Sequence, residues 1–182
     1  IVAWMKRFTE IICDMYANRI NKPMKTIVLR PGNLYGPHDK FDWEKSKVIP
    51  ALIRRAVEKH DPFLVWGDGM DLKDFLYIDD YIDGMLLAME KLDKYQPINI
   101  ANGKAVTIRD VLNEILIASD YQNATLEYDT SKPTMIPKRM IDISLANDLL
   151  GWMPKVSLNE GIQRTVDWYK ETFSNRTPED VI

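Results

Sequence analysis

The sequence has 182 residues, of which 46% are hydrophobic and 28% are charged, and its formal net charge is −3. This composition is typical of a soluble globular protein, and the slight acidity argues against general nucleic-acid binding. The single cysteine excludes an internal disulfide, and the lack of an apolar run of about 20 residues argues against a membrane span. We therefore expect a cytoplasmic protein with neither a nucleic-acid nor a membrane partner.

The first predicted element is a helix over residues 3–18. Its apolar stripe includes Trp4, Phe8 and Met15, which recur at helical spacing. Because the sequence starts at Ile1, directly in this patterned segment, we interpret it as a piece of a longer protein.

The segment TIVLRPGNLYGP, residues 26–37, predicts a strand that ends in a glycine-containing loop. The run at residues 26–29 has no polar face, which is typical of a parallel strand covered on both sides. Pro31 cannot donate to a ladder, and Gly32 allows backbone angles that other residues avoid. Open α/β sheets bind ligands beyond such strand ends, although an ordinary loop fits the pattern equally well.

The rest of the sequence alternates short strands with helices, which indicates an α/β fold. Strands are expected at 63–66, 74–78, 97–101 and 124–128, and helices at 48–59, 81–91, 108–118, 144–150 and 158–173. Asp79 or Asp80 is expected to cap the second of these helices, and Thr107 with Asp110 to form a capping box on the third.

Several motifs together resemble the extended short-chain dehydrogenases/reductases that act on nucleotide sugars, above all the GDP-fucose synthase-like members. They are, in family order, RPGNLYGP, KVIPALIRR, VWGDG, LKDF, YIDD and NIANGKAVTIRD, and they extend over most of the chain. The resemblance implies the C-terminal part of a Rossmann-like parallel sheet plus the smaller α/β substrate-binding subdomain. Residues 1–182 would then lack the N-terminal dinucleotide-binding half.

On the cofactor side, the resemblance implies that Lys6 is the catalytic lysine of a Tyr-x-x-x-Lys motif and also holds the nicotinamide ribose. It places Pro31, Asn33 and Leu34 at the nicotinamide end of NAD or NADP. The tyrosine position holds Val2, which has no proton to exchange. Vector-derived first residues, an inactive protein and a replaced tyrosine all stay open, and we favour a truncated chain with altered ends. Without the resemblance, Lys6 would be interpreted as a solvated helix lysine.

On the substrate side, the resemblance implies a site for a nucleotide-diphosphate sugar. Arg55, Lys73 and Arg139 would neutralise the diphosphate, with Lys138 as the alternate for Arg139, and Trp66 would stack on the base. The implied substrate contacts are Asn33, Lys47, Val48, Arg55, Trp66, Lys73 and Arg139. The competing interpretations are a solvated helix face for Arg54 and Arg55 and a core position for Trp66.

The sequence contains no Gly-x-x-Gly-x-x-Gly turn between a strand and a helix, the feature that cradles a dinucleotide pyrophosphate. His38 and His60 are far apart and lack a cysteine partner pattern, so no metal site is expected. Two hypotheses follow. The chain is the substrate-binding part of an NAD(P)-dependent epimerase, reductase or dehydratase that works by hydride transfer, for which the resemblance suggests a homodimer through the Lys6 helix. Alternatively, it is a non-catalytic nucleotide-sugar binding module or an inactive homologue, which Val2 favours.

Overall fold

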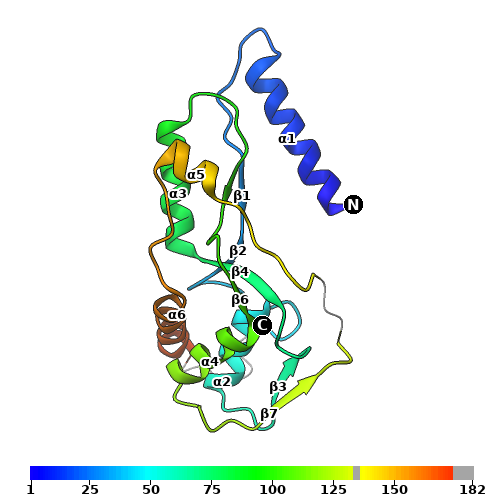
Figure 1. The fold of residues 1–182 in the computed structure, drawn as a ribbon, viewed down its shortest axis with the longest axis vertical. Coiled ribbons are helices and arrows are strands. Elements are labelled where there is room, and N and C mark those ends of the chain that lie inside the picture. The colour runs from blue at the N-terminus through cyan, green and yellow to red at the C-terminus, as the bar shows by residue number, and fades with distance from the viewer. Residues whose placement is uncertain (133–135, 174–182) are drawn as a thin grey trace.

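The structure is a computed structural model that describes residues 1–132 and 136–173. In chain order its elements are α1 (Val2–Asn18), β1 (Leu29–Pro31), β2 (Asn33–Tyr35), α2 (Val48–Val57), β3 (Phe63–Trp66), β4 (Leu72–Tyr77), α3 (Ile78–Lys91), β5 (Ile98–Ile100), β6 (Ala105–Thr107), α4 (Ile108–Ala118), β7 (Leu126–Asp129), α5 (Ser144–Leu150) and α6 (Leu158–Phe173). The arrangement is elongated: α1, α3 and α5 surround β1 and β5 at one end, and α2, α4 and α6 gather near β3 and β7 at the other (Figure 1).

Strand pairing divides the described strands into small sheets. β1 pairs with β5 in parallel, and β3 pairs with β7 in parallel. Between them, β4 pairs with β2 in parallel and with β6 in antiparallel orientation. Only Gly32 separates β1 from β2, so one extended stretch passes from one sheet to the next. An added Cβ at Gly32 would lie 3.1 Å from the Ala101 Cβ, so a larger residue there would require Ala101 to shift.

Each end of the molecule has its own apolar core. The larger is formed by the facing sides of α2, α4 and α6 with β2, β3 and β4, and includes Ile53, Phe63, Leu112, Ile115 and Ile162. The smaller lies among α3, α5, β4 and β5, and includes Leu76, Ile98, Ile100, Leu150 and Trp152. Helices α2 to α6 therefore pack through their apolar sides, whereas the predicted stripe of α1 is exposed.

The first predicted strand is wrong in its position. Residues 26–28 form no strand, and β1 begins at Leu29 and includes Pro31. The Gly32 N–H donates to the Ile100 carbonyl at 2.9 Å. Because alternate residues of a strand face its partner, the Pro31 nitrogen lies on the side away from β5, where a missing N–H breaks no bond. The predicted run at residues 26–29 is half-buried and is not fully covered on both faces.

Helix starts show one confirmed prediction and one error. Thr107 and Asp110 form the expected capping box on α4. Neither aspartate caps α3, because that helix already begins at Ile78 and takes both aspartates into its first turn. Asp80 is buried instead and accepts bonds from the backbone N–H groups of Lys155 and Val156, 3.1 and 2.9 Å away.

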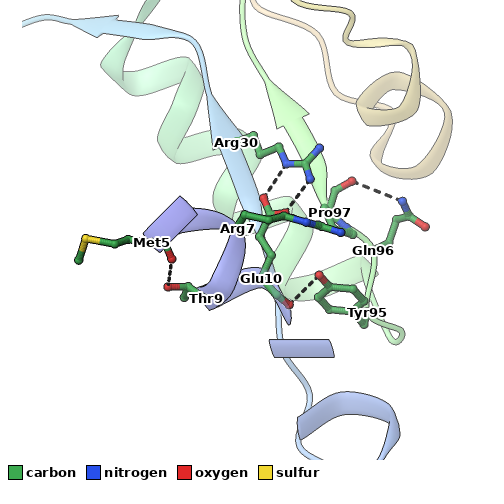
Figure 2. A network of polar contacts seen from close by, with 8 residues as sticks. All are labelled: Met5, Arg7, Thr9, Glu10, Arg30, Tyr95, Gln96 and Pro97. Atoms are coloured by element: carbon green, nitrogen blue, oxygen red, sulfur yellow. Dashed lines mark hydrogen bonds and ion pairs between the residues drawn. The ribbon is translucent and has the colours of Figure 1, made fainter. Parts of the chain in front are cut away.

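Helix α1 has no buried residue, and the contacts that tie it to the body are polar (Figure 2). The Glu10 carboxylate accepts from Arg30 Nε at 2.7 Å and from Arg30 Nη2 at 2.8 Å. Arg7 lies 2.7 Å from the same carboxylate, and the Tyr95 hydroxyl donates to the Glu10 carbonyl at 2.9 Å. Hydrogen bonding to Arg30 is the main reason that the pKa of Glu10 falls to about 2.

Candidate functional site

The main candidate site is a cavity of about 260 Å³ between the start of α2 and the end of β3. Leu52, Val65 and Ile108 contribute its apolar surface, and the side chains of Trp43 and Trp66 add flat aromatic surface. Its lining consists of Trp43, Glu44, Ser46, Lys47, Val48, Ala51, Leu52, Arg55, Val65, Trp66 and Ile108. Flat aromatic surface beside cations suits a planar ring that carries an anionic group.

Arg55 brings a positive charge to this cavity from α2. Its guanidinium lies 5.4 Å from the Trp43 ring centroid, while that of its buried neighbour Arg54 lies 4.2 Å from the same ring. Burial lowers the pKa of Arg55, which shows that its charge is partly desolvated. Arg54 belongs to the framework, since it pairs with Glu58 at 2.8 Å and donates to the Phe41 carbonyl at 2.8 Å. A solvated helix face is therefore wrong for Arg54.

Trp66 lies at the carboxyl end of β3 with 61% of its surface exposed, so it is not a core residue. The Lys132 ammonium lies 5.5 Å from its ring centroid. An exposed indole at the edge of a cavity offers a stacking face without a role in the core.

A second cavity of about 230 Å³ lies where β2 ends. It is lined by Leu34, Tyr35, Gly36, Pro37, His38, Asp39, Lys47 and Ile78. Lys47 lines both cavities, and its ammonium lies 3.8 Å from Asp39 Oδ1. One cation is thus shared by two adjacent hollows.

Three other predicted contact residues line neither cavity and lie around β4 instead. Asn33 donates its side-chain amide to the Asp74 carbonyl at 2.9 Å. The Arg139 backbone N–H donates to the Leu72 carbonyl at 2.9 Å. Lys73 pairs with Asp71 at 3.0 Å and also donates to the carbonyl of residue 136. Lys73 therefore has a counter-charge within the chain.

The predicted cofactor residues are spread over three elements. Leu34 lies in β2 and contacts the second cavity, whereas Pro31 lies exposed at the end of β1. Lys6 is exposed on α1, one turn before Glu10, and the Glu10–Arg30 pair places α1 beside the residue that precedes Pro31. Val2, which opens α1, is also exposed.

Sequence reasoning missed part of the main cavity. Trp43 and Glu44 come from the polar segment between β2 and α2, while Val65 and Ile108 come from β3 and α4. The one available signal was a tryptophan in an otherwise polar, turn-rich stretch, where it has no local core to join.

The described residues offer neither a metal cluster nor a membrane-spanning helix. Within residues 1–132 and 136–173, no three His, Cys, Asp or Glu side chains lie where they could hold a metal ion. None of the helices in that part of the chain combines the length and apolar character needed to cross a membrane.

Comparison with known families and proteins gives a consistent result. The model of the NAD dependent epimerase/dehydratase family matches residues 3–101. GDP-L-fucose synthase 1 of Arabidopsis thaliana is 37% identical over 169 residues, which are 90% of this chain and 51% of that protein. GDP-L-fucose synthase of Escherichia coli (strain K12) is 33% identical over 173 residues, which are 88% of this chain and 53% of that protein.

Two solved structures that resemble this chain are nucleotide-sugar epimerases. A UDP-glucose 4-epimerase from Thermotoga maritima with UDP-glucose has a TM-score of 0.80 at 28% identity, over 91% of this chain and 52% of that one. A UDP-glucuronic acid 4-epimerase from Bacillus cereus, in complex with UDP-glucuronic acid and NAD, has a TM-score of 0.76 at 30% identity, over 90% of this chain and 50% of that one. The expected Rossmann-like α/β fold is confirmed, and the chain spans about half the length of the relatives it matches.

Proposed function

This chain belongs to the NAD dependent epimerase/dehydratase family, and on that premise we propose that it forms the substrate-binding part of an enzyme acting on a nucleotide-diphosphate sugar by hydride transfer. The observation that carries the proposal is the cavity in which Trp43 and Trp66 accompany Lys47 and Arg55. An indole face can stack on any nucleotide base, and the cations attract the diphosphate of the same nucleotide.

The geometry supports a direction for the ligand. The base would occupy the cavity beside Trp66, with the diphosphate near Arg55 and Lys47. Because Lys47 also lines the cavity at the end of β2, the sugar would extend toward that hollow and Leu34. Lys73 would have to exchange its contact with Asp71 for one with a phosphate, and Arg139 would approach from the neighbouring segment.

The cofactor fits this chain only in part. Lys6, Pro31, Asn33 and Leu34 would meet the nicotinamide end of NAD or NADP, which when bound would donate or accept the hydride. The pyrophosphate needs a glycine-rich turn that the sequence does not contain. We therefore propose that residues 1–182 contribute the substrate side and that a dinucleotide-binding portion completes the site.

Calorimetric titration of the 182-residue chain with GDP, UDP and dTDP tests the proposal. We expect at least one of them to bind with a Kd below about 1 mM, and Arg55→Ala to weaken that binding about tenfold because a charge-assisted bond is lost. Absence of binding by all three nucleotides would contradict the proposed function. GDP is the first choice, because the two curated relatives described above are GDP-L-fucose synthases.

A non-catalytic binding module is the second candidate, and the exposed Val2 at the expected tyrosine position favours it. The two candidates differ in turnover. A fusion of this chain to the dinucleotide-binding half of a relative, given NAD(P)H and a nucleotide sugar, should oxidise the cofactor if the chain is the substrate-binding part of an enzyme. The same fusion should bind GDP without oxidising the cofactor if the chain is only a binding module.

A further inference from the structure

Asp74 is a fully buried carboxylate in β4 that none of the roles above requires. Its Oδ1 accepts from the Asn102 N–H at 2.8 Å, and its Oδ2 accepts from the Gly103 N–H at 2.9 Å. The Ile141 N–H, 3.3 Å away, donates to Oδ2 as well. One side chain therefore joins β4 to the turn after β5 and to the segment that carries Arg139.

The backbone around Asp74 holds the same region. Asn33 donates to the Asp74 carbonyl, and Arg139 donates through its N–H to the carbonyl of Leu72. Gly32 also adjoins this carboxylate, because an added Cβ there would lie 3.3 Å from Asp74 Oδ1. The two proposed contacts Asn33 and Arg139 are thus fixed to one short piece of strand, with Asp74 at its centre.

A carboxylate is a costly choice for a core position. Burial raises the pKa of Asp74, while hydrogen bonds from the Asn102, Gly103 and Ile141 backbones and the charge of Arg139 act in the opposite direction. An apolar residue would avoid the desolvation cost, but it could not accept three N–H bonds from two separate segments. The Asp74 carboxylate thus fixes the positions of the turn at Asn102 and Gly103 and of the segment at Ile141. A residue with such contacts can determine where the side chains of these two segments lie.

We propose that Asp74 is a positioning residue that holds Arg139 in place for the diphosphate of the nucleotide sugar. The proposal rests on the proposed function, and Asp74 itself touches no ligand. Asp74→Asn retains the size of the side chain, but its amide N–H₂ is a donor. It would face at least one backbone N–H that now donates to the carboxylate, so that bond would be lost. The segment around Ile141 would lose its tether, which is its bond to the Asp74 side chain, and would be held to β4 by the backbone bonds at Leu72, so the Arg139 side chain would sample more positions.

Amide hydrogen exchange tests the tether without any ligand. Asp74→Asn should speed exchange at Asn102, Gly103 and Ile141 and leave the amides of α4 unchanged. The matched control is Asp80→Asn, which alters another buried carboxylate that accepts backbone N–H bonds, here from Lys155 and Val156. Should Asp74→Asn fail to fold, the unmodified chain still decides, because fast exchange of its Ile141 amide would overturn the tether.

A double-mutant cycle tests the positioning role. GDP and GMP are titrated against the unmodified chain, Asp74→Asn, Arg139→Ala and the double variant. Asp74→Asn should weaken GDP binding about tenfold and reduce the preference for GDP over GMP. In a chain that already carries Arg139→Ala, Asp74→Asn should weaken GDP binding little further. Asp80→Asn should leave that preference unchanged.

The outcomes of this titration distinguish failure of the proposed function from failure of the positioning role of Asp74. If the unmodified chain does not bind GDP, the proposed function fails for GDP and the diphosphate role of Asp74 fails with it. If the unmodified chain binds GDP but Asp74→Asn keeps the full preference for GDP over GMP, Asp74 is not a positioning residue and the proposed function stands. Additive losses in the double variant would also overturn the positioning role, since independent effects add.

Discussion

At the scale of single residues, two adjacent arginines show what local pattern cannot decide. Arg54 and Arg55 follow each other on α2, yet Arg54 is buried against Glu58 and the Phe41 carbonyl, whereas Arg55 lines the cavity. The sequence places both on a polar helix side. Only the path of the segment before α2, which brings Phe41 and Trp43 over the helix, separates their roles.

Trp66 provides the residue-scale prediction. Trp66→Ala should weaken GDP binding about tenfold or more, because stacking on an aromatic side chain contributes roughly 1–3 kcal/mol per base. The melting temperature should change little, since 61% of Trp66 is exposed. Titration calorimetry and a thermal melt measure the two effects.

Trp4→Ala is the matched control for this experiment. It removes an equally large and even more exposed indole, 78% accessible on α1, which lines neither described cavity. Its GDP affinity should equal that of the unmodified chain. If both tryptophan variants bind GDP as tightly as the unmodified chain, the base does not stack on Trp66.

At the scale of elements, local chemistry predicts helices better than strands. The extents of α4 and α5 were predicted because the Thr107 cap and Gly151 mark their ends in the sequence itself. β6 was not predicted, and β1 was misplaced by three residues, because both exist only through pairing with distant strands. The same limit applies to the site: motif resemblance suggested Lys47, Arg55 and Trp66, but no local signal joins them to Ile108.

The attachment of α1 should depend on pH. Glu10 titrates near pH 2 when it is bonded to Arg30, against an ordinary value of 4.5. Because the folded pKa is depressed, the stabilisation is complete above about pH 4.5 and is lost as pH falls toward 2. We expect α1 to detach over this range while the two cores persist, which NMR of the Tyr95 ring, hydrogen-bonded to the Glu10 carbonyl, would detect.

Glu10→Gln isolates this effect from the other carboxylates that titrate in acid. The variant should already hold α1 more weakly at pH 7, because a neutral amide cannot replace the ionic pair with Arg30. It should also show a smaller change between pH 4.5 and 2. An identical acid response in both chains would rule out Glu10 as the group that controls α1.

At the scale of the whole molecule, the end that carries α1 exposes more apolar surface than the α1 sequence pattern predicts. α1 lies on one side of β1 in Figure 1, with α3 and α5 on the other. Trp4, Met5 and Phe8 are each more than half exposed on α1, and within the described residues β1 pairs only with β5. An apolar helix and an unpaired strand edge are the features by which a further α/β layer would join. A homodimer through α1 would cover the same helix and stays a prediction, which sedimentation can test.

The proposed division of the site leads to a prediction about ligand preference. The 182-residue chain should bind GDP but show no binding of NADH up to about 1 mM, because the cavity proposed for the base lies within it whereas the sequence has no glycine-rich pyrophosphate turn. Calorimetry with both ligands under one set of conditions measures the difference. Fusion of the corresponding N-terminal half of a relative should restore NADH binding and reduce the exposure of Trp4, visible as a blue shift in its fluorescence. Micromolar NADH affinity in the unfused chain would contradict the division of the site, since these residues would then hold the dinucleotide without the turn.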